Sequence, residues 1–481
     1  MASGKALNVA NLESLGAARL AELLVEISAG DAAAKRRLRL ALAGSAGSGE
    51  AAREVAKRLA SIAKAKSFID WQKVKPLVAD LGAQRRAILD LVAPTDPGEA
   101  FDLLWRLVGC AESVFARSDD GSGRLSAAFR KAARDLGPLV QGAKLDPIVL
   151  AARIFTALCD DGYGTWDGVI PILAPQLGAA GLNRLRELIA AWKAEPIAVP
   201  SKHERQVVGW SSAGEIYADE IETGHRRHTA KFVLQQIADV LGDVDSYIAQ
   251  IDADARNAPV IAAAIARRLL AVGRPQEAWD ALEAARQSKR DRIPIEWEQA
   301  RIDTLEALGR PADAQAFRWE RFLATLNATH LRAHLRALPD FENFEAEQRA
   351  LAHALTYSDV HQAFGFFIAW PDLERASQLV LARAHELNGD HYELLTPAGD
   401  ALEAKHPLAS TLVRRAMIDF TLGGARPSRY KHAARHLAKC RSMARRIEDF
   451  GGVPDHAAYE RALQATQRRK SAFWQEASLF S

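Results

Sequence analysis

Three possible metal ligands, His432, His436 and Cys440, follow one another at four-residue intervals in the sequence. On a helix this spacing places all three side chains on one face, and imidazole nitrogen and thiolate sulfur are both zinc ligands. One straight helix cannot arrange three ligands tetrahedrally around a single ion, and the neighbouring lysines and arginines would repel a cation. We therefore interpret these residues as a packing face, and the sequence predicts no metal and no cofactor.

The same stretch carries the strongest basic cluster, because residues 426–446 contain eight lysines and arginines and no acidic residue. A surface of one charge sign can neutralise phosphates and release counterions. The residues that could contact nucleic acid or a partner are Arg429, Lys431, Arg435, Lys439, Arg445 and Arg446. The net charge of the whole chain is only +3, so no global field indicates nucleic acid. We prefer a simpler interpretation, in which this segment is a solvated helix face. Acidic residues on neighbouring pairs of helices would then balance its charge.

Two further groups of residues could hold a metal ion, but neither has a complete ligand pattern. His225 and His228 would need a carboxylate such as Glu215 brought close by the surrounding loop, and nothing in the sequence fixes that geometry. The acidic loops at 118–121 and 160–162 lack the alternating ligands and the closing glutamate of a calcium loop. We expect both loops to be turns in which an aspartate caps the next helix.

No motif of a known catalytic site is present. The sequence lacks a Gly-x-Ser-x-Gly elbow, a His-Glu-x-x-His pair and a glycine-rich strand-to-helix crossover. The glycine-rich stretch 43–51 lacks the lysine and the hydroxyl residue of a phosphate loop. We therefore expect a protein without catalytic residues. A hydrolase or metal enzyme built around His225 and His228 is the catalytic alternative.

Helices must position these side chains, and two of them repeat. Residues 259–326 contain two similar copies of a helix, a small-residue turn and a second helix. The Gly-Arg-Pro turns at 273–275 and 309–311 lie 36 positions apart, close to the roughly 34-residue period of tetratricopeptide repeats. Glycine supplies a left-handed helix end and proline opens the next helix. Such hairpins stack and present a concave surface to partners.

Helical periodicity returns between the breaks along the rest of the chain, and no stretch alternates with a period of two over several strands. The sequence predicts an all-α protein, a tetratricopeptide-like helical-hairpin solenoid preceded by an irregular helical domain. The expected parts are an N-terminal helical domain (1–197), a linker or irregular segment (198–228) and a helical repeat domain (229–481). Within the last part we expect the first helix to run from about residue 229 to 241.

The composition is that of an ordinary globular protein, with 48% hydrophobic and 26% charged residues. Cys110, Cys159 and Cys440 are widely scattered, so we expect small core residues rather than disulfides. The first residues lack the apolar region of a secretory signal. No uncharged apolar run approaches the roughly 18 residues that span a bilayer. We expect a soluble, cytoplasmic protein with no membrane contact.

Several segments together resemble an uncharacterised bacterial family of all-helical proteins, a domain of unknown function, over nearly the whole chain. Among these segments are LESLGAARLAELLVEISAGDAAAKRRLRLAL, SFIDWQKVKPLVADL and SRYKHAARHLAKCRSMARRIEDFGGVPDHAAYERALQATQRRKSAFW. The first and the last are also similar to the helical portion of bacterial SWIM-type zinc-finger proteins. The Cys-x-Cys…Cys-x-His arrangement of that finger is absent here, so its nucleic-acid role does not carry over. The resemblance implies a helical architecture and no catalytic residues.

The paired hairpins and the lack of a catalytic signature favour one functional hypothesis. We expect a non-catalytic cytoplasmic scaffold or adaptor that binds a protein partner through the groove of a helical-repeat stack. The alternative is a nucleic-acid-binding helical protein that uses the basic segment 426–446.

Overall fold

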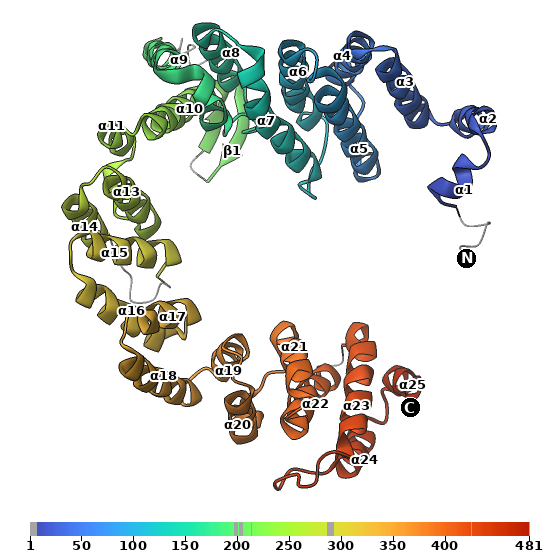
Figure 1. Cartoon of the computed structure of the whole chain (residues 1–481), viewed down its shortest axis with the longest axis vertical. Helices are drawn as coiled ribbons and strands as arrows, with labels where there is room; N and C mark the ends of the chain where they lie inside the picture. Colours follow the sequence, from blue (N-terminus) through green and yellow to red (C-terminus); the bar gives the residue numbers. More distant parts are fainter. Residues whose placement is uncertain are drawn as a thin grey trace. The chain divides into compact units, whose positions relative to one another are not determined.

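The computed structural model describes residues 7–196, 201, 205–212, 214–285, 293–424 and 426–480. Within these ranges the chain forms twenty-five α-helices and one two-stranded sheet (Figure 1), so the predicted all-α class is confirmed. Contacts divide the chain into two compact units, Met1–Ile261 and Ala262–Ser481. The domain boundaries expected at residues 197 and 228 stay a prediction, and part of the expected linker lies outside the described residues.

The first unit is built from helices that pack mainly on their neighbours in the sequence, such as α6 on α7 and α8 on α9. The helices of this unit are α1 (Val9–Glu13), α2 (Ala17–Ser28), α3 (Ala32–Ala46), α4 (Ser48–Lys64), α5 (Trp71–Ala87), α6 (Pro97–Phe115), α7 (Arg124–Ala143), α8 (Pro147–Cys159), α9 (Val169–Ala194), α10 (Ala218–Leu241), α11 (Val244–Ala249) and α12 (Ala253–Arg256), with a π-helical turn, η1 (Ile88–Val92), after α5.

Helix α6 forms the centre of the first core. Phe101, Leu104 and Val108 are completely buried, as their helical spacing predicts. Trp105 is partly buried, and its ring lies 4.4 Å from that of Trp166, centre to centre. The apolar stripe of α6 therefore holds α4, α7 and the chain before α9 around it.

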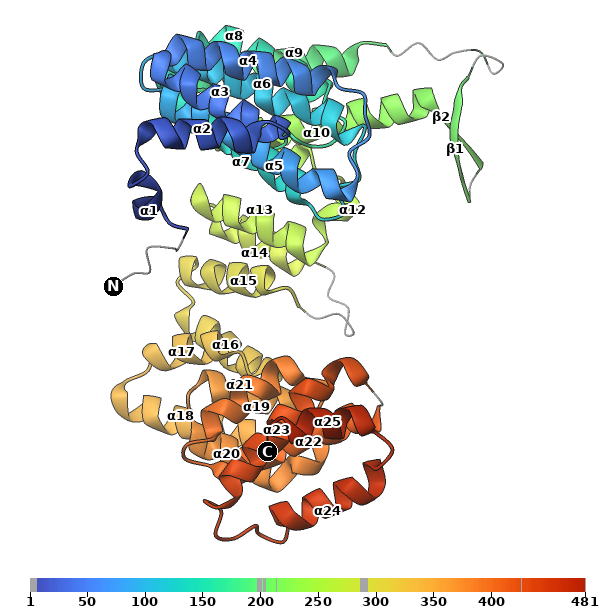
Figure 2. The ribbon, with the colours of Figure 1, turned by 90° about the vertical axis from the view of Figure 1, so that its right-hand side faces the viewer.

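A short β-hairpin precedes α10 (Figure 2). Strands β1 (Val207–Ser211) and β2 (Gly214–Tyr217) pair antiparallel, and α10 begins at Ala218 rather than near residue 229. The expected irregular segment is therefore ordered where it is described. The sequence did not predict the strands, because the residues of β1, VVGWS, do not alternate between apolar and polar. The burial of β1 in the structure does not alternate either. Arg205 ties the hairpin to α10, because its guanidinium pairs with Asp219 at 2.8 Å and lies over the Tyr217 ring.

The second unit consists of short helices in the same sequential packing. Its helices are α13 (Pro259–Ala271), which crosses the division, α14 (Pro275–Glu283), α15 (Ile295–Ala307), α16 (Pro311–Thr325), α17 (Ala328–Arg336), α18 (Asp340–Leu355), α19 (Val360–Ala369), α20 (Leu373–Arg383), α21 (Tyr392–Leu402), α22 (Pro407–Gly423), α23 (Tyr430–Ala444), α24 (His456–Gln467) and α25 (Ser471–Ser478), with 3-10 turns η2 (Ala384–Glu386) and η3 (Pro427–Arg429).

The two Gly-Arg-Pro turns have the same backbone structure. In the first, Gly273 has a φ of +74° and the amide of Arg274 donates to the carbonyl oxygen of Leu269 at 2.8 Å. In the second, Gly309 has a φ of +70° and the corresponding bond measures 2.9 Å. This bond defines the Schellman motif, in which a left-handed residue ends the helix. A proline begins the following helix in both copies, so the predicted turns are confirmed.

A buried carboxylate joins three consecutive helices of the second unit. Glu298 on α15 is 3% exposed and accepts a hydrogen bond from Nε of Arg321 on α16 at 2.7 Å. Its other oxygen lies 2.7 Å from Nε2 of His330 on α17. Burial raises the pKa of Glu298, but the hydrogen bonds from His330 and Arg321 outweigh that effect, so the pKa lies below its ordinary value.

We expect the substitution Gly273→Ala to lower the free energy of unfolding of the second unit by about 1 kcal/mol, because an L residue is strained at positive φ. Gly365→Ala is the matched control. Gly365 lies inside α19 in ordinary contact with Leu394, so alanine there should stabilise by about 0.5 kcal/mol. Denaturant unfolding measures both changes, and a neutral Gly273→Ala would contradict the turn assignment.

We expect Glu298→Gln to destabilise the protein by about 3 kcal/mol at pH 7, because Arg321 loses its buried partner. The folded-state pKa of Glu298 is depressed. Its contribution is therefore complete above the unfolded pKa and disappears as the pH falls through the depressed folded pKa. Unfolding curves from pH 7 to pH 3 measure this difference. Glu296→Gln, at an exposed position of α15, should show almost none.

Candidate functional site

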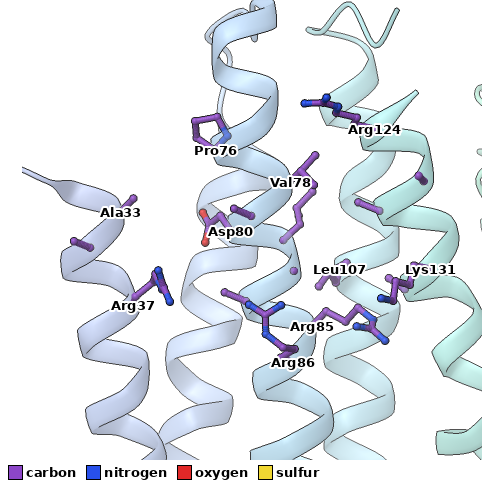
Figure 3. Close-up of a pocket in the computed structure, with 18 of the residues that line it drawn as sticks. Ala33, Arg37, Pro76, Val78, Asp80, Arg85, Arg86, Leu107, Arg124 and Lys131 are labelled. Atoms are coloured by element: carbon purple, nitrogen blue, oxygen red, sulfur yellow. The ribbon is translucent and has the colours of Figure 1, made fainter. Parts of the chain in front are cut away.

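A groove of about 760 Å³ lies over α5, with α3 on one side and α7 on the other (Figure 3). Alanines, a glycine and a few aliphatic residues form most of its lining, so the groove has an apolar floor. These residues are Ala33, Ala34, Val78, Ala79, Leu81, Gly82, Ala83, Leu107, Ala127, Ala128 and Ala132. We call this the α5 groove. Its volume lies within the range of about 300–1,000 Å³ that is usual for ligand sites.

Aspartates accept hydrogen bonds from the first-turn amides of α3 and α7, which line the groove. Asp31 accepts hydrogen bonds from the amides of Ala33 and Ala34, which lowers the pKa of its carboxyl. Asp120 accepts from the amides of Leu125 and Ser126 in the first turn of α7. Asp120 belongs to one of the acidic loops, so the prediction that an aspartate of this loop binds the start of the next helix is confirmed there.

Asp80 on α5 anchors two neighbouring helices beneath the groove. Its Oδ2 accepts a hydrogen bond from Nε of Arg58 on α4 at 2.8 Å and lies 3.7 Å from Nε of Arg36 on α3. On the other side, Arg85 of α5 forms an ion pair with Asp135 of α7. These pairs hold α3, α4 and α7 against α5, and they therefore set the width of the groove.

Positive charge surrounds the apolar floor. The cations that line the α5 groove are Arg37, Arg85, Arg86, Arg124 and Lys131. Arg85 is paired with Asp135, and the other four are exposed and form no ion pair with any residue that the structure describes. The two acidic lining residues are already engaged, Asp31 as a helix cap and Asp80 with its arginines. Figure 3 shows the cations on α3, α5 and α7 around the opening.

The residues of the α5 groove were not among those that the sequence predicted to be functional. A signal was present, because the segments AAAKRR, ADLGAQRR and RLSAAFRKAA each place arginine or lysine beside an alanine face. Such segments also occur on ordinary solvated helices. Only the approach of α3, α5 and α7 brings the three alanine faces together.

The basic segment 426–446 is partly neutralised by carboxylates from other elements. Arg429 pairs with Asp390 at 2.7 Å, and Lys439 pairs with Asp400 at 2.6 Å. Arg446 donates to the backbone oxygen of Ala404. The remaining three predicted contact residues, Lys431, Arg435 and Arg445, are exposed and have no ion pair among the described residues. Three of the six predicted contact residues therefore remain available to bind a nucleic acid or a partner.

The histidines and cysteine first considered as metal ligands are not gathered around one point. His432 is exposed, whereas Cys440 is fully buried and directs its sulfur toward the backbone oxygen of Thr411 at 3.8 Å. Burial raises the pKa of the Cys440 thiol to about 12, which disfavours the thiolate. His225 and His228 lie on α10, within a helix rather than a loop. The described part of the chain contains no group of three or more histidine, cysteine or acidic residues that could hold a metal ion.

The three cysteines form no disulfide. Cys110 and Cys440 are buried, as expected for small core residues, whereas Cys159 is half-buried. Among the helices that the structure describes, none combines the length and apolar character needed to cross a membrane.

Comparison with known protein families gives one result. The model of a family of unknown function, DUF6880, matches residues 2–476, which is nearly the whole chain. The chain therefore belongs to this family, in agreement with the resemblance to a domain of unknown function. No curated protein matches the chain.

We expect Asp80→Asn to lower the free energy of unfolding of the first unit by about 2 kcal/mol, because Arg58 and Arg36 lose a charged partner that is mostly buried. Asp90→Asn is the matched control at an exposed position and should change stability by less than about 0.5 kcal/mol. Denaturant unfolding of the two variants gives the comparison. Equal stability would show that Asp80 does not anchor the groove.

Proposed function

We propose that this member of the DUF6880 family is a non-catalytic scaffold or adaptor, and that it binds an acidic amphipathic helix of a protein partner in the α5 groove. The observation that carries the proposal is the combination of an apolar floor with four cations that lack ion pairs among the described residues. A partner helix with apolar residues on one face and carboxylates along both flanks has the matching chemistry.

The floor supports a helix as the bound element. Alanine and glycine dominate the lining, so a partner backbone can approach closely while its larger side chains occupy the groove. Apolar anchors at positions i, i+3, i+4 and i+7 would lie along α5 and lose contact with water. Burial of these anchors would provide the main favourable free energy of binding.

The cations support an acidic partner. Arg37 stands on α3, whereas Arg124 and Lys131 stand on α7, so carboxylates on either flank of a bound helix would meet positive charge. Exposed charge pairs chiefly accelerate association and select the partner, and salt screens them. Binding should therefore weaken as ionic strength rises.

We also propose a repeat architecture for the C-terminal part of the chain and a cytoplasmic location for the protein. Residues 229–481 would form a tetratricopeptide-like stack, and the protein would act in the cytoplasm of a bacterium. The similarity of the terminal segments to the helical portion of SWIM-type proteins fits a helical scaffold without the finger. The sequence favoured a groove within that stack as the partner-binding surface. The lining and charge of the α5 groove instead favour partner binding by the first unit.

Nucleic-acid binding through residues 426–446 is the alternative. Lys431, Arg435 and Arg445 would be available for phosphate contacts, but Arg429 and Lys439 are engaged by carboxylates.

The α5 groove is also poorly suited to nucleic acid. None of the described residues that line it is aromatic, so this groove offers no platform on which bases could stack. Both observations favour a protein partner.

Charge reversal tests the proposed function. The probe is a synthetic amphipathic peptide with leucines on one face and glutamates on both flanks, titrated into the full chain by fluorescence anisotropy. We expect the triple variant Arg86→Glu, Arg124→Glu, Lys131→Glu to weaken binding at least tenfold, because attraction becomes repulsion. Arg134→Glu, at an exposed position of α7 outside the groove, should change affinity less than twofold.

Unchanged peptide binding by the triple variant would contradict the proposal. If the triple variant keeps its fold by circular dichroism and binds the peptide as tightly as the wild type, the α5 groove is not the binding surface. An oligonucleotide could instead bind the wild type more tightly than the peptide does. If the same three substitutions abolish that binding, the groove binds nucleic acid.

A further inference from the structure

We propose that a cavity of about 420 Å³ between α21, α22 and α23 binds a small anionic metabolite through a phosphate or carboxylate group. The cavity belongs entirely to the second unit and is independent of the α5 groove and of the function proposed for it. Its lining residues are Gly389, Tyr392, Thr396, Asp400, Arg414, Met417, Thr421, Ser428, Arg429, His432, Ala433, Arg435, His436 and Lys439.

The charges around the cavity leave a positive excess. The lining cations are Arg414, Arg429, Arg435 and Lys439. Three carboxylates balance part of this charge, because Asp390 pairs with Arg429 while Asp400 and Glu403 both pair with Arg414 and Lys439. Arg426, outside the lining, also pairs with Asp390, so five cations against three carboxylates leave two positive charges. Arg435 is the lining cation that has no ion pair among the described residues, so it is the residue best able to meet an anion.

Arg414 forms the fixed base of the cavity. Its side chain is completely buried in α22, and its Nη2 donates to Asp400 at 2.6 Å and to Glu403 at 2.8 Å. Its Nε is buried and has no hydrogen-bond partner among the described residues. A guanidinium is costly to bury, and this one needs two carboxylates, Asp400 and Glu403, to pair with it. The chain nevertheless keeps this charge at the wall of an open space.

The contact with Arg414 also fixes the tautomer of His436. Nη1 of Arg414 lies 3.2 Å from Nδ1 of His436. A guanidinium can only donate, so Nδ1 accepts and the ring proton resides on Nε2. Burial, together with the nearby charge of Arg414, lowers the pKa of His436 to about 4, so the ring is neutral at physiological pH. No described residue accepts from Nε2, which leaves this N–H as a donor at the cavity wall.

The remaining polar lining matches an organic anion rather than a bare ion. Tyr392 is 45% exposed at the cavity, and the guanidinium of Arg429 lies 4.6 Å from the centre of its ring. Ser428 adds a hydroxyl. The anionic group would bind Arg435 and Nε2–H of His436 through charge-assisted hydrogen bonds. The volume leaves room for a body that carries further hydroxyl or carboxyl groups.

Isothermal titration calorimetry of the full chain tests this site with pyrophosphate, citrate and glucose. We expect one equivalent of pyrophosphate or of citrate to bind, and glucose to give no heat of binding. Pyrophosphate alone would assign a phosphoryl ligand, and citrate alone would assign a polycarboxylate. The substitution Arg435→Gln should weaken binding at least tenfold, whereas Arg445→Gln, at an exposed position after α23 and outside the cavity, should change it less than twofold.

Two results would overturn the proposal. One is the absence of binding by both anions. The other is an equal affinity of the wild type and the Arg435→Gln variant, which would place any bound anion elsewhere. Thermal melting of each variant checks that the fold is intact. If Arg435→Gln does not fold, Arg435→Lys replaces it, because lysine keeps the charge but lacks the planar guanidinium. Unchanged anion affinity in both Arg435→Lys and His436→Gln would then reject the site.

Discussion

Burial of one apolar stripe per helix against its sequence neighbours is the constraint on which both units depend. Helices of this length are marginal in water by themselves, so their stability comes from packing. The core of the first unit runs from Leu40 to Ile237 as one cluster, whereas the second unit contains several smaller clusters. Packing nevertheless leaves open spaces between α3, α5 and α7 and between α21, α22 and α23, and these spaces supply the two proposed sites.

Three charged residues join helices that apolar contacts alone would not orient. Asp80 links α5 to α3 and α4, Glu298 links α15 to α16 and α17, and Arg414 links α22 to the end of α21 and to α23. Each is largely buried, so removal of one partner leaves a costly charge behind. Asp80 lines the α5 groove and Arg414 lines the anion cavity. The same ion pairs that orient the helices therefore also shape the open spaces beside them.

Local features could be predicted from the sequence because their causes are local. Gly273 and Gly309 mark helix ends through their left-handed conformation, and Asp120 caps α7 within a few residues. The sites could not be predicted in this way. The α5 groove depends on the distance between helices that are not adjacent in sequence. The basic segment appeared unbalanced because Asp390 and Asp400, which neutralise part of it, precede it by tens of residues. Only a charged residue within the apolar run of α22 hinted at the anion cavity.

Site-specific photocrosslinking would show whether the α5 groove binds a protein partner. A benzoylphenylalanine placed at Ala128, on the floor of the α5 groove, would capture whatever occupies the groove in the native cell. The same group at Gln141, an exposed position of α7 outside the groove, serves as the control. We predict a crosslink at Ala128 alone, to a peptide with carboxylates at helical spacing around an apolar face. Crosslinks to nucleic acid, or equal capture at both positions, would contradict it.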